Sequence, residues 1–157
     1  MYFEYRSLGD FMDEILVVCP KCGSKGVVKT HYKEVWEAKF SCPNCSFYKI
    51  WDGNPNAFVT AHFNYEQYDG ILFGPPVDCF FRYPLWYQVP CKDETLYAYN
   101  MNHLNWLKQY VEAKLRERTQ TVHGWNNASL QSRLPKWMLS SKNRTAVLKR
   151  IAELERK

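Results

Sequence analysis

The chain has 157 residues, of which 46% are hydrophobic, 17% aromatic and 24% charged. These proportions are typical of a globular protein with a buried core, and they exclude the fibrous and intrinsically disordered classes. The net charge of +5 is uneven: residues 1–100 hold nine Lys/Arg and twelve Asp/Glu, whereas residues 101–157 hold twelve and four. A basic C-terminal part predicts contact with nucleic acid or with an acidic protein surface, or else a helix surface whose Lys and Arg are only solvated.

The N-terminal residues predict a short helix and no targeting signal. Leu8, Phe11, Met12 and Ile15 recur at roughly helical spacing, which predicts a helix within residues 1–14. The same segment is acidic, which is the wrong chemistry for a secretory or transit peptide. The apolar run that follows is far shorter than the roughly 20 residues that cross a bilayer. We therefore expect a cytoplasmic protein whose six cysteines stay reduced.

Residues 15–52 have the composition of strands. Strand-like segments occur at residues 27–28, 32–40 and 47–51. Within the second run, the apolar Trp36, Ala38 and Phe40 alternate with charged residues. Alternation of this kind predicts a strand with one face buried and the other in water.

Two cysteine pairs of identical spacing lie in this strand-rich region. The first is Cys19-Pro20-Lys21-Cys22 and the second is Cys42-Pro43-Asn44-Cys45, with nineteen residues between them. Two residues between cysteines allow a tight turn that directs both sulfurs at one point. Four thiolates in a tetrahedron suit Zn²⁺, and a site closed by four protein ligands has no position for a reacting water. We therefore predict a structural Zn²⁺ ion, with iron as the competing metal because four thiolates accept either ion. The predicted ligands are Cys19, Cys22, Cys42 and Cys45.

Residues 19–51 resemble a zinc ribbon, in which two cysteine knuckles at the tips of β-hairpins hold one zinc ion, and the knuckles also resemble those of rubredoxin. The segments 96–100 (Leu-Tyr-Ala-Tyr-Asn) and 134–137 (Leu-Pro-Lys-Trp) resemble small bacterial zinc-ribbon proteins of unknown function. The resemblance implies a β-ribbon and its metal. Zinc ribbons occur in transcription factors, polymerase subunits, ribosomal proteins and protein-binding adaptors, so the resemblance implies no single activity.

The middle of the chain predicts short strands. Residues 53–99 are dense in aromatic residues and prolines, which disfavour helix. Residues 85–89 and 95–99 read as two strands, and Lys92, Asp93 and Glu94 form a polar turn between them. We expect a β-hairpin there.

The C-terminal part predicts helices. Asn100 or Asn102 is placed to cap a helix over residues 100–118. A short helical turn is expected at Pro135, and Asn143 is placed to cap a final helix. The apolar stripe of the first helix consists of Met101, Leu104, Leu107, Val111 and Leu115. That of the last helix consists of Val147, Leu148, Ile151 and Leu154.

Together these elements predict an α+β protein. Its N-terminal four-cysteine zinc ribbon is joined to a small antiparallel aromatic-rich sheet, and C-terminal helices follow. We expect the ribbon and the short N-terminal helix to span residues 1–52. The aromatic sheet and the basic helices would span residues 53–157 and share one core with the ribbon.

The first functional hypothesis is nucleic-acid binding, in which the basic C-terminal helices contact phosphates. The alternative is a protein-interaction module, such as an adaptor or an inhibitor or immunity-type protein, with Trp125, Trp137 or exposed aromatic residues as anchors. No membrane partner and no small-molecule substrate are indicated. The candidate phosphate contacts are Lys108, Lys114, Arg116, Arg118, Lys142, Arg144, Lys149 and Arg150.

We expect no catalytic activity. The four histidines fall in no metalloprotease arrangement, and no Ser or Cys lies in a nucleophile motif. An enzyme that uses His62 or His103 in an aromatic cleft is a third hypothesis. Cys79 and Cys91 lack knuckle spacing, and we interpret them as buried small hydrophobic residues. Their alternative role is a second metal site with His62 or His103.

Overall fold

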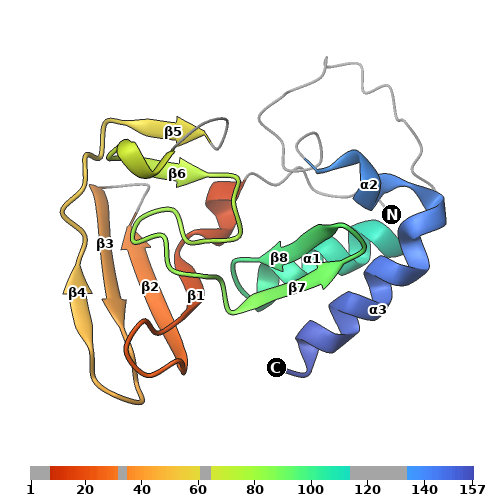
Figure 1. Ribbon diagram of the computed structural model, residues 1–157, viewed down its shortest axis with the longest axis horizontal. Helices are drawn as coiled ribbons and strands as arrows, with labels where there is room; N and C mark the ends of the chain where they lie inside the picture. Colours follow the sequence, from red (N-terminus) through yellow and green to blue (C-terminus); the bar gives the residue numbers. More distant parts are fainter. Residues whose placement is uncertain (1–7, 32–34, 61–64, 114–133) are drawn as a thin grey trace.

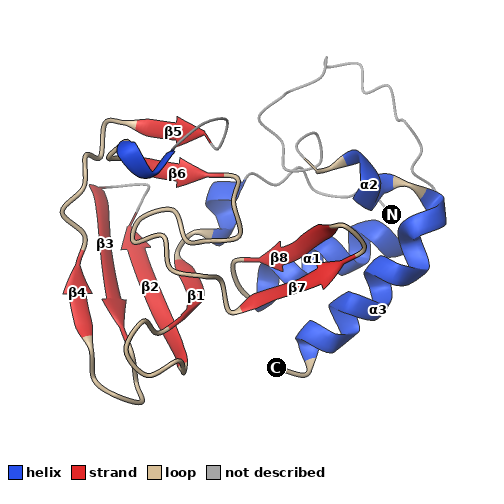
Figure 2. Cartoon of the chain, viewed as in Figure 1, coloured by secondary structure: helices blue, strands red, loops and turns tan. Residues whose placement is uncertain are grey.

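The computed structural model describes residues 8–31, 35–60, 65–113 and 134–157. These residues form an α+β fold, with a four-stranded sheet at one end and a β-hairpin packed on helices at the other (Figure 1). The strands and helices are largely segregated along the long axis of the molecule (Figure 2). The predicted fold class is therefore confirmed.

The four-stranded sheet is an antiparallel meander in the order β1-β2-β3-β4. Its strands are β1 (Glu14–Val18), β2 (Lys25–His31), β3 (Val35–Ser41) and β4 (Tyr48–Ile50). One face of the sheet is buried and the other is exposed, as the alternation in β3 predicts: Ala38 and Phe40 are buried, whereas Glu37 and Lys39 are exposed. The side chain of Trp36 lies outside the described part of the chain.

The predicted N-terminal helix is wrong where the structure describes it. Only a single 3₁₀ turn, η1 (Leu8–Phe11), forms, and residues 1–7 are outside the described ranges. Ile15, which was part of the helical pattern, lies in β1 and is fully buried. The run Ile15–Val18 is apolar and mostly β-branched, and it pairs with β2, so strand pairing overrides the helical spacing.

The aromatic middle of the chain forms less sheet than expected, and its first pair of strands is parallel. Strands β5 (Phe58–Thr60) and β6 (Ile71–Phe73) make a two-stranded parallel pair, with the 3₁₀ turn η2 (Tyr65–Gln67) between them. The hairpin of β7 (Tyr87–Cys91) and β8 (Glu94–Ala98) confirms the predicted one. Aromatic residues of the loop between β6 and β7 pack instead on the buried face of the four-stranded sheet.

A buried carboxylate organises that loop. Asp78 is fully buried, and its carboxylate accepts backbone N–H bonds from Phe80, Phe81 and Tyr83 at 2.7–2.9 Å. Burial raises the pKa of Asp78 to about 6, although these N–H groups act in the opposite direction. The loop therefore depends on one side chain to satisfy three backbone donors.

We expect the substitution Asp78→Ala to lower the free energy of unfolding by about 2–4 kcal/mol, because three backbone N–H groups, one buried and two partly buried, lose their acceptor. Asp69→Ala is the matched control, since Asp69 is exposed and such substitutions change stability by about 0.5 kcal/mol or less. Denaturant unfolding of the metal-loaded protein measures both. Equal stability of the two variants would mean that water replaces the carboxylate.

The C-terminal part contains the predicted helices. Helix α1 (Met101–Glu112) is capped by Asn100, whose side chain accepts the N–H of His103 at 2.9 Å. Residues 114–118 of the predicted helix lie outside the described ranges. Helix α2 (Lys136–Leu139) follows Pro135, and the 3₁₀ turn η4 (Ser141–Asn143) leads into α3 (Arg144–Glu155).

Asn143 precedes α3 as predicted, but its side chain does not cap the helix. Its amide donates to the carbonyl of Trp137 at 2.8 Å, and its oxygen accepts from the ammonium of Lys92. Because the residue is buried between the hairpin turn and α2, these tertiary partners take the side chain away from the helix end.

Two buried clusters form the interior of the described part of the chain. The ribbon cluster contains Met12, Ile15, Val17, Cys19, Val28, Ala38, Phe40, Cys42, Ile71, Cys79, Phe80, Leu85 and Tyr99. The helical cluster contains Phe11, Tyr87, Cys91, Leu96, Ala98, Leu104, Trp106, Leu107, Val111, Met138, Val147, Ile151 and Leu154. The boundary at residue 52 and the single shared core stay predictions.

Strand β1 lies between the two clusters. Ile15 and Val17 belong to the ribbon cluster, whereas Leu16 packs against the helical cluster. The edge of β1 that does not pair with β2 forms hydrogen bonds with residues on either side of the β7–β8 hairpin. The Leu16 N–H donates to the carbonyl of Tyr99 at 2.8 Å, and the Trp86 N–H donates to the carbonyl of Leu16 at 2.9 Å. The two ends of the molecule are thus joined through backbone hydrogen bonds. No helix in the described ranges is long and apolar enough to cross a membrane.

Candidate metal centre

The four predicted ligands lie in two turns at the same end of the sheet (Figure 1). The first turn joins β1 to β2, and the second joins β3 to β4. In each turn the backbone carbonyl of the first cysteine accepts the N–H of the residue four positions later. Gly23 donates to Cys19 and Ser46 donates to Cys42, at 2.9 Å in both cases. The turns therefore repeat one backbone geometry at two distant places in the sequence.

The fourth residue after each leading cysteine has a left-handed backbone. Gly23 has φ 75° and Ser46 has φ 64°. A left-handed residue reverses the chain so that the leading cysteine can also donate its own N–H back, from Cys19 to Ser24 at 2.8 Å and from Cys42 to Phe47 at 2.9 Å. Glycine meets this requirement without strain, whereas serine does so at some energetic cost.

The four sulfurs form one compact group. The distance between Cys19 Sγ and Cys45 Sγ is 3.7 Å, and that between Cys22 Sγ and Cys42 Sγ is 3.5 Å. All four lie within 4.8 Å of one another. Ligands at a Zn–S distance of 2.3 Å in a tetrahedron would be about 3.8 Å apart, so the group has the size that such an ion requires. These distances are far longer than a disulfide bond of about 2.05 Å, and all four cysteines are free.

Local donors favour thiolates, and the crowding of sulfurs opposes them. The Asn44 amide donates to Cys22 Sγ at 3.6 Å, and with nearby Ser24 donors it lowers the pKa of Cys22 to about 6. The Phe47 N–H lowers the pKa of Cys45, but partial desolvation and the three neighbouring sulfurs outweigh it and raise that pKa to about 12. Four thiolates this close need a cation between them to be negatively charged together.

The site lies at the edge of the ribbon cluster. Cys19 and Cys42 are 2% exposed and belong to that cluster, whereas Cys22 and Cys45 are exposed. An ion held here would bind two turns to each other and anchor both to the apolar interior.

Known proteins give no further guidance. The chain has no significant match to a protein-family model, a curated protein or a solved structure. The likeness to zinc ribbons therefore rests on the two knuckles and on the geometry of the four sulfurs. What the structure shows is a cysteine cluster positioned to bind a metal ion.

The other cysteines and histidines do not form a second cluster in the described ranges. Cys79 lies in the ribbon cluster, with its sulfur 2.9 Å from the Tyr99 hydroxyl, whereas Cys91 lies in the helical cluster. His103 is buried beside Phe11, its Nδ1 accepts the Tyr99 N–H at 3.0 Å, and burial lowers its pKa to about 3. His62 is outside the described residues. Cys79 and Cys91 are thus buried small side chains, as the sequence predicts.

The candidate phosphate contacts fall into three groups. Lys114, Arg116 and Arg118 lie outside the described ranges, as does Trp125. Lys108 pairs with Glu155 at 3.1 Å, and Arg150 pairs with Glu153 at 2.9 Å. Arg144 is half-buried, whereas Lys142 and Lys149 are exposed. Of the five described members of the set, Lys142 and Lys149 are thus exposed, whereas the side chains of Lys108 and Arg150 are 40% and 41% exposed and each is engaged in an ion pair.

The sequence interpretation did not select Arg156, which follows α3 and is exposed. It also did not select Lys29, Lys39 and Tyr48, which line one pocket on the exposed face of the sheet. The signal for the strand residues was present in the charged positions of β3, but strand register was needed to bring them together.

Proposed function

We propose that the protein is a non-catalytic nucleic-acid-binding protein, in which a structural Zn²⁺ ion held by the four cysteines maintains the ribbon. A site closed by four thiolates has no position for a substrate or a reacting water, which supports a structural role. We propose zinc and not iron because closed, tetrahedral four-cysteine sites are typical of structural zinc. Elemental analysis of the purified protein tests this, and one zinc per chain is expected.

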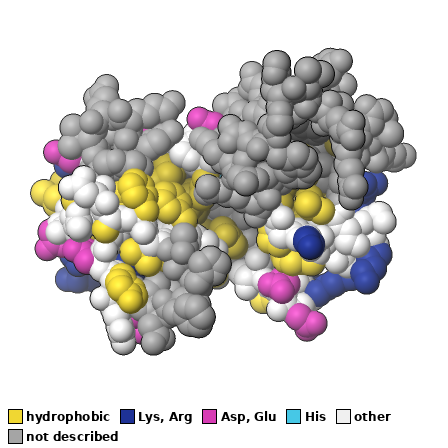
Figure 3. Space-filling model, turned by 90° about the horizontal axis from the view of Figure 1, so that it is seen from above, with side chains coloured by type: hydrophobic (Ala, Val, Ile, Leu, Met, Phe, Trp, Pro, Cys, Tyr) yellow, Lys and Arg dark blue, Asp and Glu magenta, His cyan; other side chains and the backbone are white. Residues whose placement is uncertain are grey.

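The exposed surface of α3 supports nucleic acid as the partner. The exposed positions from Arg144 to Arg156 are Thr145, Lys149, Ala152 and Arg156, so this stripe carries basic and small residues only. Lys142 is also exposed just before the helix. Figure 3 shows Lys and Arg side chains gathered at the outer margin of the helical end. We call Lys142, Lys149 and Arg156 the basic stripe.

The acidic residues of α3 do not cancel this charge. Glu153 and Glu155 are half-buried, and each is already paired with a cation, Arg150 and Lys108 respectively. Lys149 and Arg156 are seven residues apart, which is two helical turns, or about 10.5 Å along the axis. Two cations at that spacing on one face can contact separate phosphates of one nucleic-acid backbone.

The triple variant Lys142→Gln, Lys149→Gln, Arg156→Gln should bind nucleic acid more weakly, and its affinity should depend less on salt. Each lost phosphate contact reduces the slope of log K against log salt by about 0.7–0.9. Fluorescence anisotropy over about 50–200 mM salt measures both quantities. Lys108→Gln is a matched control for Lys149→Gln, because the charge of Lys108 is already paired with Glu155. Absent or salt-independent binding by the unmodified protein would remove this function.

A protein-interaction module is the second candidate, and one surface feature favours it. Phe58 and Tyr68 are 58% and 60% exposed near the parallel strand pair, and the Phe58 ring stacks on Phe73. Exposed aromatic residues commonly anchor protein interfaces. A stoichiometric protein partner recovered after nuclease treatment, and lost in Phe58→Ser, would support this candidate over the first.

A further inference from the structure

The exposed face of the four-stranded sheet carries an arrangement that the folding of the chain does not require. Register places Lys29 of β2 directly opposite Lys39 of β3. Two like charges in directly opposite positions of neighbouring strands destabilise the sheet. Glu14 approaches Lys29 at 3.8 Å, but both side chains are about 60% exposed, so this ion pair contributes little. The lysine pair therefore favours an external anion beside its ammonium groups.

Two large side chains flank this lysine pair on the neighbouring strand. Ile50 is opposite Lys39, and Tyr48 is opposite Ser41, which puts both on the same face as the lysines. Tyr48 is 54% exposed and Ile50 is 58% exposed. A tyrosine ring in water on a sheet is an available stacking surface.

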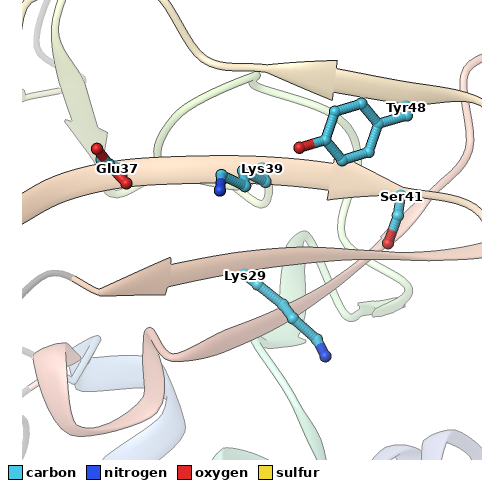
Figure 4. A pocket seen from close by; sticks show the side chains of 5 residues that line it. All are labelled: Lys29, Glu37, Lys39, Ser41 and Tyr48. Atoms are coloured by element: carbon cyan, nitrogen blue, oxygen red, sulfur yellow. The ribbon is translucent and has the colours of Figure 1, made fainter.

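Tyr48 and the two lysines line one pocket together with Glu37 and Ser41, and its volume is about 200 Å³. Figure 4 shows the Tyr48 ring lying over β3 with its hydroxyl toward Lys39, while Glu37, Lys39 and Ser41 come from alternate positions of β3. Glu37 can accept hydrogen bonds from an amino group, and Ser41 can donate or accept. The lining of the pocket thus combines cations, an aromatic ring and polar groups.

We propose that this exposed sheet face binds single-stranded nucleic acid, with phosphates at Lys29 and Lys39 and a base stacked on Tyr48. The inference rests on the proposed function, since it names the form of nucleic acid and a second contact surface. The two lysines of the pocket outnumber its one carboxylate, Glu37, which favours an anionic partner, and the exposed ring beside the cations favours one with planar bases. In a duplex the base faces are stacked on one another and cannot reach Tyr48, so a single strand is favoured.

The experiment compares variants of the full-length, zinc-loaded protein on a fluorescent oligothymidylate and on a duplex of equal length. Tyr48→Ala should weaken oligothymidylate binding by about 5- to 150-fold, and Tyr48→Phe should retain it, because the ring and not the hydroxyl stacks. Lys29→Gln and Lys39→Gln should each reduce the salt slope by about 0.7. Lys49→Gln, on the opposite face of β4, is the charge-matched control. Zinc content and circular dichroism verify that the variants are folded.

The outcomes separate this inference from the proposed function. A loss confined to the single strand in Tyr48→Ala, with the duplex unaffected, supports the sheet surface. Unchanged binding in Tyr48→Ala, together with weaker binding when the basic stripe is removed, overturns the inference and leaves the function intact. A polyglutamate peptide that competes as well as the oligonucleotide at equal salt overturns it in favour of an acidic protein segment. Absence of binding to either nucleic acid overturns both.

Discussion

Removing the metal with a strong chelator under reducing conditions should unfold the four-stranded sheet. Structural zinc in small domains contributes about 10–16 kcal/mol at neutral pH, which equals or exceeds the roughly 5–15 kcal/mol stability of a typical domain. In this chain the ion would hold the β1–β2 turn to the β3–β4 turn, and Cys19 and Cys42 are part of the ribbon cluster. Without the cation, at least some of the four thiols must bind protons or separate.

Amide hydrogen exchange followed by mass spectrometry measures this effect by segment. We expect protection in β2, β3 and β4 to be lost on chelation and restored by added zinc. Peptides from α1 and α3 should lose less protection, because the helical cluster contains none of the four ligands. Persistent protection of the sheet in metal-free protein would contradict a structural role for the ion.

Cysteine variants provide an independent measurement. Cys19→Ser and Cys45→Ser should each reduce bound zinc below one per chain and lower the melting temperature. Cys91→Ala is the matched control, since Cys91 is buried in the helical cluster, away from the other sulfurs. It should keep a full complement of zinc even if its own stability decreases modestly. Equal zinc content in all three variants would exclude the proposed ligand set.

The parts of the fold that sequence predicts are those specified by local spacing. Two cysteines separated by two residues define a turn within four positions, so the ligands need no knowledge of the rest of the chain. The β7–β8 hairpin and α1 have strong periodicity and short-range contacts, and both are present. Asn100 caps α1 because its acceptor and the donor at His103 are three residues apart.

The parts that sequence did not predict depend on distant partners. The apolar residues at the start of β1 and before it have a spacing that also fits a helix. Only the pairing of β1 with β2 and its hydrogen bonds to residues beside the β7–β8 hairpin favour the strand. The parallel pairing of β5 with β6 has no signal in either strand alone. Asn143 has the right position for a cap, but Lys92 and Trp137 engage its side chain first.

The same limit applies to the candidate binding surface. From the sequence, Lys108 and Arg150 are predicted to be available to phosphate. In the structure Lys108 is paired with Glu155, which lies 47 positions further along the chain. Conversely, the opposition of Lys29 and Lys39 exists only because β2 and β3 pair in one register. Net charge therefore identifies the basic C-terminal part, but ion pairing and strand register decide which cations, in that part and in the sheet, are available to a partner.

The Phe40 ring joins the ribbon to the loop that follows β6, so the substitution Phe40→Ala should have a large effect. The ring is fully buried and lies 5.2 Å from the Tyr83 ring and 6.3 Å from the Phe81 ring, both in edge-on arrangements. It also lies 5.6 Å from Phe47, directly after the second knuckle. Truncation of a buried Phe to Ala typically lowers the free energy of unfolding by about 3–5 kcal/mol.

The matched control is Ile50→Ala on the exposed face of the same sheet, where loss of an exposed side chain should change stability by about 0.5 kcal/mol or less. Denaturant unfolding at saturating zinc compares the two variants. Because Phe40 contacts the residue after the second knuckle, Phe40→Ala should also weaken zinc binding, as measured by competition with a chromogenic chelator. A variant that loses stability but binds zinc as tightly as the unmodified protein would show that the knuckles are organised independently of the interior, and the ion then stabilises the turns and not the sheet.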